Sequence, residues 1–134
     1  MNIRILVVTH GELGAAFTET VSDIMGRTEE VEVFGVVRGM PADDIRAQFE
    51  ELLGSMLEGS SAVLVLTDMP GGTPANISVP RLDDERVEVI TGLNLPMLLT
   101  AIHRRSSVKD IRELSGVAAS AGAKGVVNFR EALR

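Results

Sequence analysis

The fold is decided by residues 62–74, which read AVLVLTDMPGGTP. The first part of this stretch, residues 62–67, is almost continuously apolar and rich in Val and Leu. A run without alternating polar positions is typical of a strand that is buried on both faces of a parallel sheet. A glycine-rich turn follows, and Thr73-Pro74 is typical of the first turn of a helix. The stretch therefore predicts a strand, a tight turn and a helix in succession.

The rest of the chain repeats this change of hydrophobic period. Further strands are predicted at residues 3–8, 31–37 and 87–91. Helices are predicted at residues 13–25, 41–56, 73–79, 95–104 and 108–121, the last with Ser106 or Ser107 as its cap. This alternation predicts an α/β fold in a single domain, residues 1–134. We expect a mostly parallel central sheet of about four strands, covered by helices on both faces.

A short final strand is predicted at residues 126–129, where Gly122 and Gly125 separate it from the last helix. The helix before this strand need not return the chain to the same edge of the sheet. A terminal strand of this kind could pair antiparallel within its own chain or with a second subunit. The sequence pattern leaves both arrangements open.

Composition excludes several classes of protein. The 134 residues include no cysteine, which excludes disulfide scaffolds, thiolate zinc sites and cysteine nucleophiles. A formal charge of −6, four Phe and no Trp or Tyr argue against nucleic-acid binding, which needs a basic face and stacking side chains. No apolar run reaches the roughly 20 residues that span a bilayer, and no signal peptide precedes the first strand. We therefore expect a soluble, cytoplasmic domain.

Polar residues at the carboxyl ends of two strands are the candidates for catalysis. His10 follows the first strand and Asp68 follows the third, and ligands of open α/β sheets bind beyond these ends. Neutral imidazole is a competent nucleophile near pH 7 when a partner fixes its tautomer. The third strand lies beside the first in common doubly wound orders. We therefore expect the Asp68 carboxylate to accept one ring N–H of His10 and to orient the ring.

The turn at residues 71–73 is a candidate phosphate site. Gly71 and Gly72 allow backbone amides to approach an anion, and the Thr73 hydroxyl adds a donor. Taken alone, this turn is more typical of a strand-to-helix connection that Thr73 caps. At the same sheet edge as His10 and Asp68, it favours phosphoryl chemistry at His10.

Rival sites lack residues that they need. The sequence contains neither GxxxxGK[ST] nor a GxGxxG after its first strand, which argues against nucleotide binding, and no GxSxG for a serine hydrolase. A metal site would use His10, Asp68 and Asn94, and no third strong ligand accompanies them. No metal and no other cofactor is therefore expected. His103 ends a predicted helix, where a cationic side chain is favourable.

Three motifs lie in order along the chain: VTHGEL at residues 8–13, TDMPGGTPAN at 67–76 and ITGLNLPML at 90–98. Together they resemble the mannose-family EIIA domain of the bacterial phosphoenolpyruvate-dependent sugar phosphotransferase system, and the match covers essentially the whole chain. The resemblance implies a phosphocarrier of the mannose/fructose/sorbose class. HPr, the small histidine phosphocarrier, would donate a phosphoryl group to Nε2 of His10, and His10 would pass it to an EIIB protein.

The resemblance also implies roles for individual residues. Asp68 would hold Nδ1 of His10, and Gly71, Gly72 and Thr73 would hold the phosphate. The domain would form a homodimer that exchanges its final strand, residues 126–129.

Two features depart from the family pattern. Met69-Pro70 stands in the turn where many members carry a bulky aromatic residue, and this bears on partner docking. Arg38 is a further candidate for docking. The chain ends at Arg134 without a fused EIIB domain. We therefore expect it to act in trans, with membrane contact only indirectly, through a permease.

Two alternative functions fit a phosphorylated histidine. One is the phosphotransfer subunit of a dihydroxyacetone kinase system, and residues 71–74 and 90–98 favour the mannose family over it. The other is a regulatory protein whose His10 phosphorylation is read by a partner without sugar transport.

Overall fold

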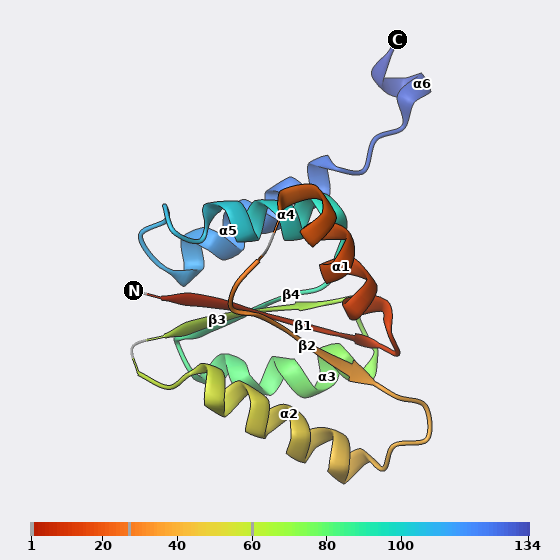
Figure 1. The fold of residues 1–134 in the computed structure, drawn as a ribbon. Coiled ribbons are helices and arrows are strands. Elements are labelled where there is room, and N and C mark those ends of the chain that lie inside the picture. Colours follow the sequence, from red (N-terminus) through yellow and green to blue (C-terminus); the bar gives the residue numbers. More distant parts are fainter. Residues whose placement is uncertain (1, 27, 60) are drawn as a thin grey trace.

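The computed structural model describes residues 2–26, 28–59 and 61–134 and is built on a four-stranded parallel sheet (Figure 1). The strand order is β2-β1-β3-β4, and all three pairings are parallel. The strands are β1 (Ile3–His10), β2 (Val31–Val36), β3 (Ala62–Thr67) and β4 (Val87–Ile90). The predicted α/β class with a central parallel sheet is confirmed.

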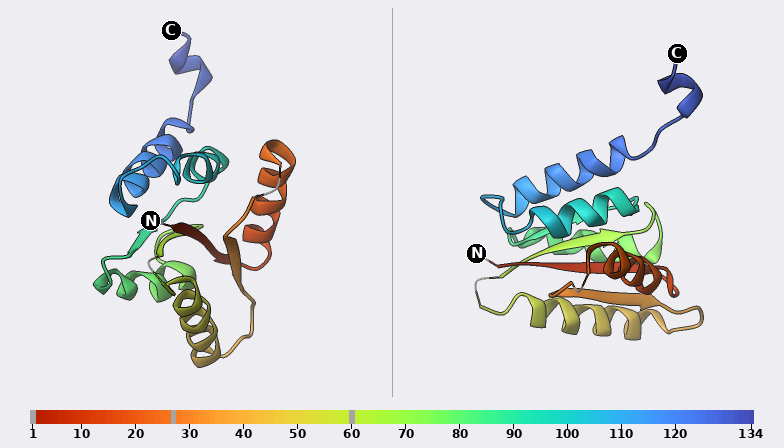
Figure 2. Two further views of the ribbon diagram at one scale, coloured as in Figure 1. Left: turned by 60° about the vertical axis from the view of Figure 1, so that its left-hand side comes forward. Right: turned by 45° about the horizontal axis from the view of Figure 1, so that its top comes forward.

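Helices cover both faces of this sheet, as predicted (Figure 2). One face carries α1 (Leu13–Met25), α4 (Leu95–Arg104) and α5 (Ile111–Lys124). The other face carries α2 (Ala42–Met56), α3 (Thr73–Ser78) and the short 3-10 helix η1 (Val79–Asp83). Within the described ranges, no helix has both the length and the apolar character that crossing a membrane requires.

Successive side chains of the central strands point to opposite faces of the sheet, so the core has two layers. Ile5 and Val7 of β1 face the layer formed with α1, α4 and α5. Leu6 and Val8 face the layer formed with α2 and α3. Every residue of β3 is buried, because this strand has a neighbouring strand on each side and helices on each face. This placement explains why residues 62–67 are continuously apolar.

Local signals set most helix ends. Gly26 follows α1 with φ of +86°, as expected of a residue that ends a helix. Asp43 and Asp44 lie in the first turn of α2, where their charge is favourable.

The cap predicted for the helix at residues 108–121 is wrong. Asp110 caps α5 by accepting a hydrogen bond from the Glu113 backbone N–H at 2.9 Å.

The start of α5 is late because Ser107 has another role. Its hydroxyl donates to the Arg104 carbonyl and accepts from Arg104 Nε, both at 3.2 Å. Ser107 therefore closes the end of α4, and the next helix begins at Ile111 rather than at residue 108.

The predicted final strand at residues 126–129 is wrong for the isolated chain. Residues 126–128 are irregular, and the helical turn α6 (Phe129–Ala132) follows, with Asn128 as its side-chain cap. This segment projects away from the domain in all three views (Figures 1 and 2). Val126 is 79% exposed and Phe129 74% exposed. A strand needs a neighbouring edge to satisfy its backbone, and within residues 2–26, 28–59 and 61–134 no sheet edge lies beside the segment.

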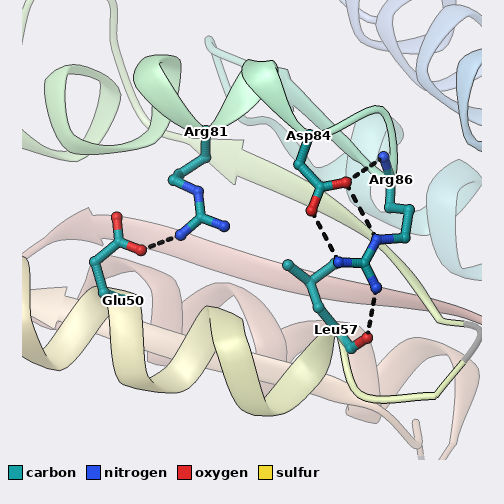
Figure 3. Close-up of polar contacts among 5 residues, drawn as sticks. All are labelled: Glu50, Leu57, Arg81, Asp84 and Arg86. Carbon is teal, nitrogen blue, oxygen red and sulfur yellow. Dashed lines mark hydrogen bonds and ion pairs between the residues drawn. The ribbon is translucent and has the colours of Figure 1, made fainter.

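Two arginines connect the segment before β4 to helix α2 (Figure 3). Arg86 pairs with Asp84 at 2.9 Å and donates to the Leu57 carbonyl at 2.9 Å, just beyond the end of α2. Arg81 forms an ion pair with Glu50. The hydrogen bonds from the Arg86 side chain and backbone hold the pKa of Asp84 below its ordinary value. These contacts hold η1 and the turn before β4 against α2.

Substitutions of two adjacent leucines of α2 test the packing of the core layer between the sheet and this helix. Leu53 is fully buried, whereas Leu52 is only partly buried at the edge of the same cluster. We expect Leu53→Ala to lower the free energy of unfolding by about 2–5 kcal/mol, because it leaves a cavity. Leu52→Ala should lower it by only about 1 kcal/mol. Urea unfolding at pH 7 measures both values, and equal losses would contradict the burial of Leu53.

Candidate functional site

His10 and Asp68 meet at the carboxyl ends of the two central strands. Strands β1 and β3 are neighbours, with Val8 opposite Thr67 in the register. His10 ends β1, and Asp68 directly follows β3. His10 Nδ1 lies 2.8 Å from Asp68 Oδ2, and the His10 backbone N–H donates to the same oxygen at 3.0 Å. The contact expected from the sequence is therefore present.

This contact defines which nitrogen of His10 is free. A carboxylate can only accept hydrogen bonds, so Nδ1 carries the proton that faces Asp68, and in the neutral ring Nε2 keeps its lone pair. The His10 side chain is 50% exposed, whereas the Asp68 side chain is only 10% exposed. Nε2 is therefore available to an incoming group while its partner is held in place.

The pKa of Asp68 is shifted by two opposing effects. Burial disfavours the charged carboxylate and raises the pKa, but hydrogen bonds from the His10 backbone and ring, together with the attraction of that ring, lower it. The net result is a pKa below the ordinary value for aspartate. Asp68 is therefore a carboxylate at neutral pH and a firm acceptor for the imidazole.

The glycine turn packs directly against the imidazole. Gly71 has φ of +80°, a conformation that side chains disfavour. A Cβ placed on Gly72 would lie 2.7 Å from His10 Cε1 and 3.2 Å from Nε2. Gly72 precedes α3, and Thr73 begins it. The backbone of this turn thus borders the edge of the ring that carries the free nitrogen.

An open cavity of about 500 Å³ lies beside His10. Thr73 and Arg38, both singled out from the sequence, also line this cavity. Its remaining lining comes mainly from the turn between β2 and α2, together with Gly11 and Ile45. Met69 and Pro70 are exposed in the turn after Asp68 but do not line it. The structure therefore brings together His10, Asp68, Gly72, Thr73 and Arg38, with Met69 and Pro70 on the adjoining surface.

Gly35 supports the site and was not singled out from the sequence. A Cβ on Gly35 would lie 2.3 Å from the Gly11 carbonyl oxygen, which no side chain can tolerate. The Gly11 backbone N–H also donates to the Val36 carbonyl at 2.8 Å. The turn after His10 therefore lies directly on β2. A glycine inside an apolar strand is a sign of close backbone approach, and this signal was available.

Asn94 and His103 lie at opposite ends of α4. The Asn94 side chain accepts from the Met97 N–H at 3.0 Å and donates to the Gly122 carbonyl at 3.0 Å, so it caps α4 and ties it to α5. His103 lies in the last turn of α4, as expected. Among the described residues, no three His, Asp or Glu side chains are grouped so that they could hold a metal ion.

Replacing Asp68 should make stability depend less on pH. The ionised form stabilises the fold fully above the unfolded pKa of about 3.9, and this contribution disappears as pH falls through the lower folded pKa. We expect Asp68→Asn to be less stable than the wild type by about 1 kcal/mol at pH 7. The difference should vanish in acid. Urea unfolding across pH measures it, with exposed Asp23→Asn as the control, and a difference that grows in acid would contradict the assignment.

The chain is similar to several known proteins. The model of a family described as the phosphotransferase system (PTS) fructose IIA component matches residues 4–116. The PTS mannose-specific EIIAB component of Escherichia coli K12 is 32% identical over 127 residues, which is 94% of this chain and 39% of that protein. The PTS fructose-specific EIIA component of Bacillus subtilis is 27% identical over 112 residues, covering 81% of this chain and 76% of that protein. The chain thus spans about 39% of the length of its mannose-specific relatives.

Solved structures share the same architecture. The EIIA component from Streptococcus agalactiae has a TM-score of 0.86 at 28% identity, covering 96% of this chain and 98% of that one. The PTS IIA protein associated with a fucose utilization operon of Streptococcus pneumoniae has a TM-score of 0.85 at 28% identity, covering 100% and 98%. The family match extends over most of the chain and includes both central strands with their catalytic candidates. The chain therefore belongs to the mannose-type EIIA family of the sugar phosphotransferase system.

Proposed function

We propose that this EIIA protein is a phosphocarrier of the mannose/fructose/sorbose class in which His10 carries the phosphoryl group. EIIA proteins are phosphotransferase-type components of the sugar phosphotransferase system. The observation that supports His10 is its geometry: Asp68 binds Nδ1 at 2.8 Å and leaves the half-exposed ring with a free Nε2. The donor is phospho-HPr and the acceptor is an EIIB protein. The family match gives no support to the dihydroxyacetone kinase alternative.

The transfer step needs a nucleophile and charge stabilisation. The Nε2 lone pair of His10 attacks the phosphorus of the donor phosphohistidine, a new N–P bond forms, and the donor N–P bond breaks. The donor imidazole leaves with the electron pair of that bond. The ring of His10 then carries positive charge with its proton still on Nδ1, and the Asp68 carboxylate stabilises it. Transfer to EIIB is the same step with the roles exchanged.

The turn at residues 71–73 would hold the phosphoryl oxygens. Gly72 borders the Nε2 edge of the ring and Thr73 lines the cavity beside it. Backbone N–H groups of Gly71, Gly72 and Thr73, with the Thr73 hydroxyl, are donors of the kind that bind phosphate. These donors suit phosphoryl transfer between proteins, because the site has only to position the phosphoryl group and stabilise its charge.

Partner proteins would dock around this cavity. Met69 is 53% exposed beside Asp68, and an exposed methionine is an adaptable contact surface. We assign Met69 and Pro70 to docking of HPr and EIIB. The protein would work in the cytoplasm as a single phosphocarrier domain, residues 1–134, and reach the membrane only through a permease.

Phosphorylation of variants tests the site. With phosphoenolpyruvate, Enzyme I and HPr, the wild type should acquire acid-labile, alkali-stable label, and His10→Ala should acquire none, because the nucleophile is gone. His103→Ala is the matched control and should label like the wild type, since His103 lies at the end of α4. Asp68→Asn should slow labelling by roughly 10²-fold, because the ring loses its orienting carboxylate. Wild-type labelling of His10→Ala would refute the assignment.

We also propose a homodimer that exchanges residues 126–129. The apolar Val126 and Phe129 are exposed on a segment that projects from the domain, and the outer edge of β4 has no neighbour among the described residues. The wild type should sediment as a dimer, and the double variant Val126→Asp/Phe129→Asp should sediment as a monomer. Leu133→Asp, on an equally exposed residue beyond the exchanged segment, should remain dimeric. A wild type that stays monomeric at high concentration would contradict the exchange.

A further inference from the structure

Arg38 lies in a turn that is fixed relative to His10. The turn joins β2 to α2, and its Gly39 has φ of +91°. The Met40 backbone N–H donates to the Val37 carbonyl at 3.1 Å, which closes the turn. The start of the turn is held by the hydrogen bond from Gly11, the residue after His10, to the Val36 carbonyl. The backbone at Arg38 therefore has a defined position beside the nucleophile.

Among the described residues that line the cavity beside His10, Arg38 is the one with a permanent positive charge. Arg38 shares the lining with His10 and Thr73, and the other lining residues carry no formal charge. Arg38 is exposed, and among the described residues no carboxylate is within ion-pair distance of its guanidinium. Its charge is therefore available to an anion that enters the cavity.

A phosphoryl group on His10 creates a need for such a charge. Phosphorylation brings a charge of about −1.5 to −2 next to the Asp68 carboxylate, which lies 2.8 Å from the same ring. These two negative charges repel each other across the imidazole ring. The neutral amides of residues 71–73 can donate hydrogen bonds, but they add no compensating charge.

We infer that the Arg38 guanidinium binds the phosphoryl oxygens on His10 from the β2 side of β1, whereas Gly72 and Thr73 lie on the β3 side. Guanidinium presents several N–H donors in a planar fork that matches phosphate oxygens. The inference rests on the proposed phosphorylation of His10 and adds a residue to it. It also changes the role expected for Arg38: the residue would contact the transferred group itself, whereas a docking residue would contact only the partner protein.

A small phosphoryl donor separates these two roles. Phosphoramidate transfers its phosphoryl group when His10 Nε2 attacks the phosphorus, the P–N bond of the donor breaks and ammonia leaves. No partner protein is present, so a docking residue cannot affect this rate. We expect Arg38→Ala to slow labelling by phosphoramidate roughly tenfold and Arg38→Lys to restore part of the rate. Arg46→Ala is the matched control, because Arg46 is exposed on α2 and does not line the cavity.

The outcomes distinguish this inference from the proposed function. Low concentrations of guanidinium chloride should raise the labelling rate of Arg38→Ala but not that of the wild type, and a merely structural role would not produce this rescue. Wild-type labelling of Arg38→Ala by phosphoramidate overturns the inference, and slowing with phospho-HPr alone assigns Arg38 to docking instead. If the wild type is labelled by neither donor, the proposed function itself is wrong. Thermal unfolding of each variant checks that the fold is retained.

Discussion

The hydrogen bonds from His10 to the Asp68 carboxylate are the interaction on which the site depends. One oxygen accepts both the ring Nδ1–H at 2.8 Å and the backbone N–H at 3.0 Å, so it sets the tautomer, the ring orientation and the end of β1 together. This is possible only because β1 and β3 are adjacent and in the register that places Val8 opposite Thr67. A slip of one residue would turn the side chains of one strand to the opposite face.

Close backbone approach is the second constraint, and two glycines provide it. Gly72 allows the turn before α3 to lie against the imidazole, and Gly35 allows the turn after His10 to lie on β2. The two contacts flank the half-exposed His10 from the strands on either side of β1. The contact at Gly35, with the hydrogen bond from Gly11 to the Val36 carbonyl, also gives the turn that carries Arg38 a fixed place in the site. A Cβ on Gly35 would clash with the Gly11 carbonyl oxygen, a backbone atom that no rotamer change can move, whereas a Cβ on Gly72 would displace the His10 ring.

The cap of α5 and the conformation of residues 126–129 in the single chain differ from the sequence pattern for the same reason. Residues 106–110 offer several good helix caps, and the sequence does not rank Ser106, Ser107 and Asp110. The choice depends on Ser107 pairing with Arg104 at the end of α4. Residues 126–129 have the composition of a strand, but pairing requires an edge that the isolated chain does not place beside them. In both cases the residues have the local preference that the sequence indicates, but the conformation depends on a contact with residues outside the segment.

Hydrophobic period and turn residues were sufficient to predict the α/β class, the four parallel strands and the position of His10 and Asp68 at their carboxyl ends, because these features follow from local geometry along the chain. Other features could be seen only in the folded chain. They are the register between strands, the Asp68 oxygen that His10 contacts, the close packing at Gly35 and the position of Arg38 beside the same cavity. They depend on residues that are far apart in sequence, and side-chain packing across the sheet is what brings those residues into contact.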